Sequence, residues 1–409
     1  MRQRRARVND RVDRRGPTLL RLARLLVAST AMLGACGDGG EREIGARLTL
    51  AEALAATGEG YAQAVEPRQF TFPQDHGPHP GFATEWWYIT GNLRATDGRR
   101  FGYQLTFFRK ALIPRPADRI SDLAADHAFM ANLAVTDVSN DVLHAFDRFA
   151  REAAGLAGAH ALPFRVWLYD WSVESTGEAT FPARIRAAED KIALELVIDA
   201  GKPPVVHGDR GVSRKSGEPG NASYYYSLTR MPTRGTIRIG DAVANVEGAS
   251  WMDREWGTRP LGGNLDAWDW FALQLSDGTE LMLYQLRTRD GGVSPFSAGT
   301  AIATDGTSRT LDADEFTIDV VDTWRSPLDG TRYPSRWRIR IPSERLELDV
   351  APLVADQELD LAVRYWEGTV GVRGTRGPEA VRGKGYVELT GYAEARGIPS
   401  ADGQVRGRR

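Results

Sequence analysis

Residues 248–257, which read GASWMDREWG, hold the side chains best suited to acid–base chemistry. Alternate residues of a β-strand share a face, so Trp251, Asp253 and Glu255 would point to one side. The two carboxyl groups would lie roughly 7 Å apart, and in an enclosed site one of them would keep a proton at neutral pH. A protonated carboxyl beside a tryptophan is a candidate general acid. The alternative is a surface ladder in which these carboxylates pair with arginines such as Arg254.

Residues 84–93, TEWWYITGNL, place one carboxylate against three consecutive aromatic side chains. In a strand, Trp86 and Tyr88 would share one face, and Glu85 would share the other with Trp87. Glu85 is therefore a third candidate catalytic carboxylate, and Trp86 and Tyr88 are candidate ligand contacts. The alternative is structural: one tryptophan fills the core and Glu85 bonds to an arginine.

Three further polar or aromatic side chains are candidate ligand contacts alongside Trp251. Tyr225 and Tyr226 belong to a run of three tyrosines with phenol groups on both faces of its strand. Asn132 stands among apolar neighbours in FMANLAVTDV. Buried phenols and amides require hydrogen-bond partners, so each of these side chains either completes a core network or contacts a ligand.

Several familiar kinds of site are absent from the sequence. It contains no G-x-S-x-G, H-E-x-x-H or C-x-x-C motif and no phosphate-binding loop, so we expect no cofactor. His76 and His79 are the only close histidine pair, and they flank prolines typical of an exposed loop, so we expect no metal. Removing residues 1–35, which carry nine Arg and two Asp, changes the formal net charge from −2 to −9, a charge that disfavours nucleic acid.

The elements that must position these residues are predicted to be strands. From about residue 68, short alternating segments are broken by Asp-Gly, Gly-Asn and Pro every 8–15 residues, a pattern typical of an all-β protein. A short amphipathic helix is predicted at 48–64, and a helical turn within 144–161.

An internal repeat indicates two homologous β units, at 68–262 and 263–397. The matching segments are FPARIR at 181–186 with YPSRWR at 333–338, Trp87 and the Asp97-Gly98 turn with Trp270 and Asp277-Gly278, and VEGASWMD at 246–253 with VRGKGYVE at 381–388. Antiparallel units of this size commonly close into barrels, which removes exposed edges and leaves room for one small ligand.

The chain resembles the AttH-type predicted secreted hydrolases, which are grouped with carotenoid 1,2-hydratase. The resemblance spans about residues 68–396 and rests on FATEWWYITGNL, YYYSLTRM, GASWMDREWG, WDWFALQLSDGTELMLYQLR and GKGYVELTGY. It implies two tandem lipocalin-like (calycin) antiparallel barrels. It carries over the residues of two signatures, which are Glu85, Trp86, Trp87 and Tyr88, and Trp251, Asp253, Glu255 and Trp256. At Asn132 we expect many relatives to carry His, which weakens the case for acid catalysis here.

The N-terminus has the features of a lipoprotein signal peptide. Residues 1–35 contain a basic segment, an apolar run of about 14 residues that is too short to span a membrane, and Leu-Gly-Ala before Cys36. Cys36, the only cysteine, is the predicted lipidation site, and 36–67 the anchored linker. The alternative is a plain signal peptide with an incidental cysteine. We expect the protein to lie in the bacterial cell envelope, on the outer membrane and facing the periplasm. We expect residues 398–409 to form a flexible tail.

Two functions fit these features. The first is an enzyme that binds an apolar isoprenoid, polyene or lipid-like molecule and adds water to it, with Asp253 as the acid. The second is a non-catalytic lipocalin-type carrier that exchanges a hydrophobic ligand with an envelope ABC transporter, a partner implied by the resemblance. The paired carboxylates favour the enzyme, and the predicted lipid anchor favours the carrier.

Overall fold

The computed structural model describes residues 59–114, 125–259 and 264–393. The predicted signal peptide, Cys36, most of the predicted helix at 48–64 and the tail at 398–409 lie outside these ranges. Residues 59–64 of that helix are described and form a turn and an irregular segment. No helix among the described residues is long and apolar enough to cross a lipid bilayer.

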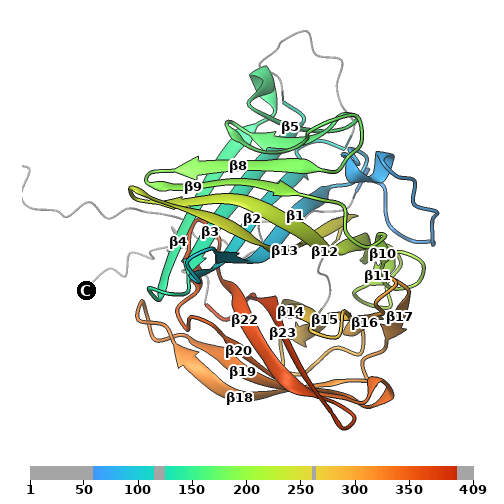
Figure 1. Cartoon of the computed structure of the whole chain (residues 1–409). Helices are drawn as coiled ribbons and strands as arrows, with labels where there is room; N and C mark the ends of the chain where they lie inside the picture. The colour runs from blue at the N-terminus through green and yellow to red at the C-terminus, as the bar shows by residue number, and fades with distance from the viewer. Residues whose placement is uncertain (1–58, 115–124, 260–263, 394–409) are drawn as a thin grey trace, which may run out of the picture. The chain divides into compact units, whose positions relative to one another are not determined.

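The described chain is nearly all β, as predicted, and its strands form two antiparallel sheets (Figure 1). The first sheet curls into a nearly closed barrel and the second into a half-barrel, the architecture of two lipocalin-like barrels. The first sheet has the order β4 (Val142–Arg151), β3 (His127–Asp137), β2 (Arg100–Ala111), β1 (Thr84–Ala95), β13 (Ala242–Gly257), β12 (Ala222–Ile239), β9 (Ile192–Ile198), β8 (Ala183–Glu189), β7 (Trp171–Ser175), β6 (Phe164–Leu168), β5 (Ala157–Ala161), with β10 (Val205–Val206) and β11 (Val212–Arg214) paired to β12.

The second sheet begins where the first ends, after a short connection that follows Gly257. Its order is β17 (Ser308–Leu311), β16 (Ala298–Ile302), β15 (Glu280–Thr288), β14 (Leu265–Leu275), β23 (Glu379–Leu389), β22 (Arg364–Arg376), β20 (Leu346–Pro352), β19 (Arg332–Ile341), β18 (Thr317–Arg325), with β21 (Glu358–Asp360) paired to β22. Within the described ranges, the helical elements are three 3₁₀ turns, η1 (Gln74–His76), η2 (Ala153–Gly155) and η3 (Pro342–Glu344). Only η2 falls in the predicted helical region at 144–161; the rest is β4 and β5.

Alternating burial explains why these segments form strands around two cores. In β9, Ile192, Leu194, Leu196 and Ile198 are buried while Glu195 between them is exposed. The same period of two appears in β6 and β8. In contrast, β1, β2 and β3 are buried on both faces over most of their length. The first core is built around Trp87, Trp171 and Trp256, and the second around Trp337 and Trp366.

The repeat is visible in the two hairpins β1–β2 and β14–β15, whose turns both contain Asp-Gly. Gly98 and Gly278 have φ of +90° and +84°, a conformation that favours glycine. Trp270 lies eight residues before its turn glycine, so its counterpart is Thr90 and not Trp87, as the sequence comparison had suggested. The structure agrees, because Trp87 packs in the first core whereas Trp270 faces away from the second core.

The two sheets meet through the faces that point away from their cores. We call this buried region the seam; it is formed by β1, β2, β3, β12 and β13 on one side and β14, β15, β22 and β23 on the other. Hydrogen bonds cross it from Tyr88 to Glu367, from Asn132 to Tyr365, and from Trp270 to Tyr225. The seam therefore contains ionisable and aromatic side chains from both repeats.

Candidate functional site

Asp253 lies in the seam, four residues before the end of β13, and only 3% of its surface is exposed. The register pairs it with Tyr88 on β1 and with Ser227 on β12. Its Oδ1 accepts hydrogen bonds from Trp251 Nε1 at 2.6 Å and from the Ser227 hydroxyl, and its Oδ2 accepts one from Tyr225 Oη at 2.6 Å. No arginine pairs with Asp253 in the described chain, which removes the surface-ladder alternative for this residue.

Burial makes Asp253 a weaker acid than an ordinary aspartate side chain. Desolvation raises the pKa of its carboxyl from an ordinary value of 3.8 to about 7. The hydrogen bonds from Ser227, Tyr225 and Trp251 act in the opposite direction, and the charge of Glu255 adds to the increase. Near neutral pH the carboxyl is thus divided between its protonated and ionised forms, as a general acid or base requires.

Glu255 shares the seam face with Asp253, as the strand alternation predicted, but its partners differ. Lys215 Nζ lies 3.3 Å from its Oε1, and the Ser223 hydroxyl donates a hydrogen bond to the same oxygen. Lys215 is buried, and burial alone would lower the pKa of the Lys215 ammonium. Nearby negative charges, the largest of which is that of Glu255, raise this pKa above its ordinary value. Glu255 therefore forms a direct ion pair with Lys215, whereas Asp253 forms none, although its charge also raises the pKa of Lys215.

The second sheet supplies two more carboxyls to the seam, Glu388 on β23 and Glu367 on β22. Trp268 Nε1 donates to Glu388 Oε1 at 2.8 Å, and Tyr88 Oη donates to Glu367 Oε1 at 2.5 Å. Burial raises the pKa of Glu388 to about 8; the hydrogen bond from Trp268 opposes this increase, and the charges of Asp253 and Glu255 add to it. Burial and the charge of Glu388 raise the pKa of Glu367 well above its usual range. Glu388 is therefore predominantly neutral at pH 7.

Four buried polar atoms of the seam have no hydrogen-bond partner among the described residues. They are Gln104 Oε1, Asn132 Oδ1, Glu367 Oε2 and Tyr386 Oη. Buried polar groups are almost always paired, so such atoms are the places where a ligand or an ordered water would bind. Asn132, one of the predicted ligand contacts, satisfies its amide nitrogen on Tyr365 Oη at 2.9 Å and leaves its oxygen free.

A chain of hydrogen bonds leads from Asp253 to a buried histidine. Ser227 Oγ, which donates to Asp253, also bonds to His207 Nε2 at 2.6 Å, and His207 Nδ1 bonds to Thr300 Oγ1 at 2.8 Å. Desolvation, with the charge of Lys215, lowers the pKa of His207 to about 3, so the imidazole is neutral. His207 is thus a positioning residue that can orient Ser227 toward the carboxyl.

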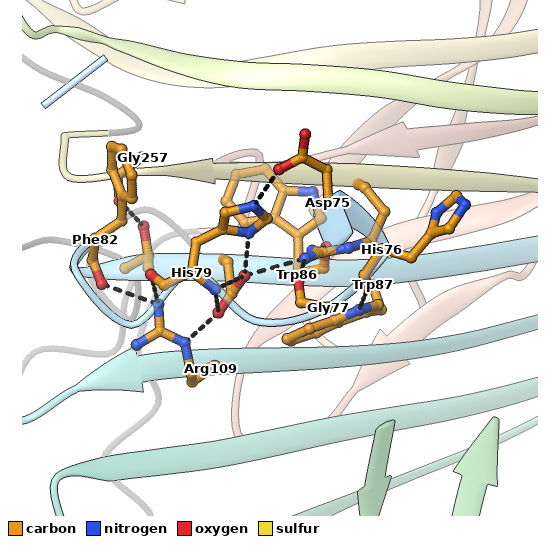
Figure 2. Close-up of polar contacts among 12 residues, drawn as sticks. Asp75, His76, Gly77, His79, Phe82, Trp86, Trp87, Arg109 and Gly257 are labelled. Carbon is orange, nitrogen blue, oxygen red and sulfur yellow. Dashed lines mark hydrogen bonds and ion pairs between the residues drawn. The ribbon is translucent and has the colours of Figure 1, made fainter. Parts of the chain in front are cut away.

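Glu85 is not part of the seam. It lies on the core face of β1 and pairs with Arg109 and, at 3.1 Å, with Arg254 Nη2, while His79 bonds to it at 3.2 Å. Figure 2 shows this network, including Arg109 directed at the backbone around Phe82. These cations hold the pKa of Glu85 far below its usual range despite burial. The structure therefore does not bring the predicted catalytic Glu85 together with Asp253 and Glu255, because successive residues of a strand face opposite sides.

The other predicted ligand contacts divide between the two faces. Trp86, Tyr88, Tyr225 and Trp251 lie in the seam. Tyr226 points into the first core, where its hydroxyl bonds to His76 Nδ1 at 2.6 Å. No cluster of three potential metal ligands occurs among the described residues.

Comparison with known proteins agrees with this arrangement of strands and motifs. Residues 63–392 match the AttH-like protein family. The chain belongs to the AttH-like family. It is 32% identical to a crystal structure described as an AttH from Nitrosomonas europaea, with a TM-score of 0.72 and coverage of 81% of this chain and 100% of that one.

Two more distant crystal structures share the fold with this AttH-like chain. Kievitone hydratase from Nectria haematococca is 17% identical, with a TM-score of 0.61 and coverage of 81% of this chain and 96% of that one. CghA is 14% identical, with a TM-score of 0.51 and coverage of 83% and 96%. At these identities the similarity concerns the fold alone. No curated protein matches the sequence.

Within this AttH-like chain, several seam residues were not singled out from the sequence: Ser227, His207, Lys215, Tyr365 and Glu367. Glu388 could have been found from the sequence, because the internal repeat aligns it with Asp253. Glu367 and Lys215 stand in segments without motif or repeat partner, and only the packing of the two sheets brings them to the site.

Proposed function

We propose that the seam is an active site in which Asp253 protonates a carbon–carbon double bond of an apolar substrate and water then adds. The observation that carries this proposal is a desolvated carboxyl, without a basic partner, with a pKa of about 7 among aromatic side chains. Protonation of an alkene requires an undissociated acid in a site sheltered from water.

Asp253 is better suited to this role than the other seam carboxyls. A stronger acid transfers its proton more readily, provided that it is still protonated at the working pH. Asp253 meets both conditions near pH 7, whereas Glu388, with a pKa of about 8, and Glu367 are weaker acids. Glu255 is engaged by Lys215 and suits the role of a base.

The proposed hydration has two steps. The Asp253 proton passes to one alkene carbon and leaves a tertiary carbocation on its neighbour and a carboxylate on Asp253. A water oxygen then bonds to the cation, and the proton that this water loses returns to Asp253, directly or by way of Glu255, which regenerates the acid. The rings of Trp251, Trp270 and Tyr88 pack edge to face with one another beside Asp253, and a ring face turned toward the cation would stabilise it by about 0.5–2 kcal/mol. The reverse sequence is a dehydration.

The relatives support a class of activity and not a particular substrate. The AttH-like family and the fold shared with a kievitone hydratase support a hydratase-like or hydrolase-like activity. The apolar nature of the substrate is inferred from the aromatic seam. The lipid anchor at Cys36 and the position in the cell envelope remain predictions.

The proposal is tested by oxygen-18 incorporation. The purified protein is incubated in H₂¹⁸O with isoprenoid and polyene lipids extracted from bacterial membranes, and the products are analysed by mass spectrometry. We expect an alcohol that carries one ¹⁸O per added water with the wild type and none with Asp253→Asn. Equal labelling with both proteins would rule out Asp253 as the acid.

One observation favours the carrier function as a second candidate. A cleft of about 850 Å³ opens beside the seam, a volume suited to holding a small ligand. A carrier would bind the ligand there and release it unchanged to a transporter. Recovery of unmodified ligand from the protein after long incubation, with no labelled product, would favour this function over the enzyme.

A further inference from the structure

The cleft lies where the two sheets continue beyond the carboxyl cluster of the seam. Residues of β1, β2, β12 and β13 line it on one side, and residues of β14, β22 and β23 on the other. Its charged lining is strongly asymmetric: six basic side chains face one acidic one, Glu247. The basic residues are Arg94, Arg100, Arg230, Arg234, Arg382 and Lys384.

Only two of these cations are neutralised by carboxylates in the described chain. Arg230 pairs with Glu280, and Arg234 pairs with Asp199. The other four form no ion pair among the described residues, so the cleft has an excess of positive charge even when Glu247 is counted. Arg94, Arg100 and Arg382 are exposed, so water and salt screen part of their repulsion, and a bound anion would reduce it further.

Lys384 is the most constrained of the four cations. Its ammonium is largely buried and donates a hydrogen bond of 3.0 Å to the backbone oxygen of Asn92. Burial, together with the charges of Arg230 and Arg94, lowers the pKa of Lys384 to about 8. A buried ammonium without a carboxylate partner is costly, and an anion bound beside it would offset that cost.

The cleft also has some apolar surface. Pro232, which is exposed, and Leu353, which is partly exposed, supply it. The side chains of Leu93 and Phe101 pack instead in the first core, and those of Leu275 and Val370 pack in the second. A ligand that satisfied both parts of the lining would carry an anionic group and a hydrocarbon portion. Inorganic anions would use only the cations.

The cleft and the carboxyl cluster belong to one continuous face of β23. Lys384, Tyr386 and Glu388 point to the same face of that strand. Four residues separate Lys384 from Glu388, so these two lie about 13 Å apart along the strand. A small cavity of about 10 Å³, lined by Trp251 and Tyr386, shares Asn92 and Gln274 with the cleft. That space is no larger than a single water needs, so Trp251 and Tyr386 separate the two regions in this structure.

We infer that the cleft is a binding site for an amphipathic anion, with its carboxylate or phosphate held by Lys384, Arg382, Arg94 and Arg100 and its hydrocarbon portion on Leu353 and Pro232. This assignment goes beyond the proposed hydration and stands without it. If both hold, the ligand of the cleft is the substrate, and its anionic end is held about 13 Å from Glu388 of the carboxyl cluster.

The assignment is tested by isothermal titration calorimetry of the purified protein with four probes: dodecyl phosphate, dodecanoate, dodecanol and inorganic phosphate. We expect dodecyl phosphate and dodecanoate to bind and to weaken as salt is raised. Lys384→Met should weaken them at least about tenfold, as should Arg382→Gln, since hydrogen bonds to ionised groups are the strong ones. Arg382 is exposed, so its variant is expected to fold even if Lys384→Met does not.

Two control variants separate this site from other effects. Arg338→Gln removes the same charge from an exposed position of β19 outside the cleft and should bind like the wild type. Asp253→Asn should also bind both ligands normally, so loss of hydration would leave the cleft assignment intact. The assignment is overturned if Arg382→Gln and folded Lys384→Met bind like the wild type, if dodecanol binds as tightly as dodecyl phosphate, or if inorganic phosphate does.

Discussion

Asp253 and Glu388 occupy matching positions on the last strand of each repeat, and both face the same buried seam. Each ends the motif Val-x-Gly-x-x-aromatic-aliphatic-acid, and each lies two residues after the aromatic side chain that borders the small cavity. The charge of Asp253 raises the pKa of Glu388. Duplication has thus placed two interacting carboxyls at one site, and only Asp253 is surrounded by three hydrogen-bond donors.

Asp253→Asn is expected to abolish catalysis while preserving ligand binding. The amide keeps the size of the side chain but cannot deliver a proton, and general acids contribute about 10²–10⁴-fold to rates. Product formation should fall by at least about 100-fold, measured with any substrate identified by ¹⁸O labelling. Asp269→Asn is the matched control, because Asp269 is also buried but pairs with Arg287 outside the seam. An equal loss with Asp269→Asn would show that the effect is structural.

The raised pKa values of Asp253 and Glu388 predict a loss of stability as pH increases. In the unfolded chain these groups lose protons near their ordinary values of 3.8 and 4.5, whereas in the folded protein they keep them to about pH 7 and 8. The folded state therefore binds more protons between about pH 4 and 8, and its free energy of unfolding falls across that range. Urea denaturation followed by tryptophan fluorescence at several pH values measures this slope.

The variants Asp253→Asn and Glu388→Gln isolate that contribution. Each removes one titrating group. The free energy of unfolding of the variant, relative to that of the wild type, should therefore increase as pH rises from 5 to 8. Parallel pH profiles would contradict a raised pKa at the substituted position.

Strand periodicity was sufficient to place part of this site from the sequence. It grouped Asp253 with Glu255 and Trp251, and it separated Glu85 from Trp86, because alternate residues must share a face. It could not show which face meets the second sheet, since that depends on packing between segments more than 100 residues apart, such as Tyr88 and Glu367.

The same reasoning explains the error over Trp87 and Trp270. Both stand in aromatic, strand-forming segments, and matching them by residue type shifted the register by an odd number of residues. An odd shift exchanges the two faces of a strand. The all-β class was predictable because it depends on local alternation and turns, whereas the cationic cleft, which needs both sheets, was not.

Glu85→Gln is expected to destabilise the protein without altering the acid. The substitution leaves Arg109 and Arg254 buried without their carboxylate, and breaking such a pair costs about 3–5 kcal/mol. Thermal unfolding should show a lower Tm, and the protein that remains folded should keep its rate per molecule. A normal Tm with lost activity would instead return Glu85 to the list of catalytic candidates.

Tyr225→Phe is expected to shift the pH dependence of catalysis. The Tyr225 hydroxyl donates to Asp253 and lowers its pKa, so removing this hydroxyl should raise that pKa further. Activity that requires protonated Asp253 declines above its pKa, and this alkaline limb should move upward by about one pH unit. The matched control is Tyr226→Phe, whose hydroxyl bonds to His76 on the opposite face of the strand and should leave the limb in place. A limb that stays fixed in Tyr225→Phe, or that moves equally in both variants, would show that it does not report on Asp253.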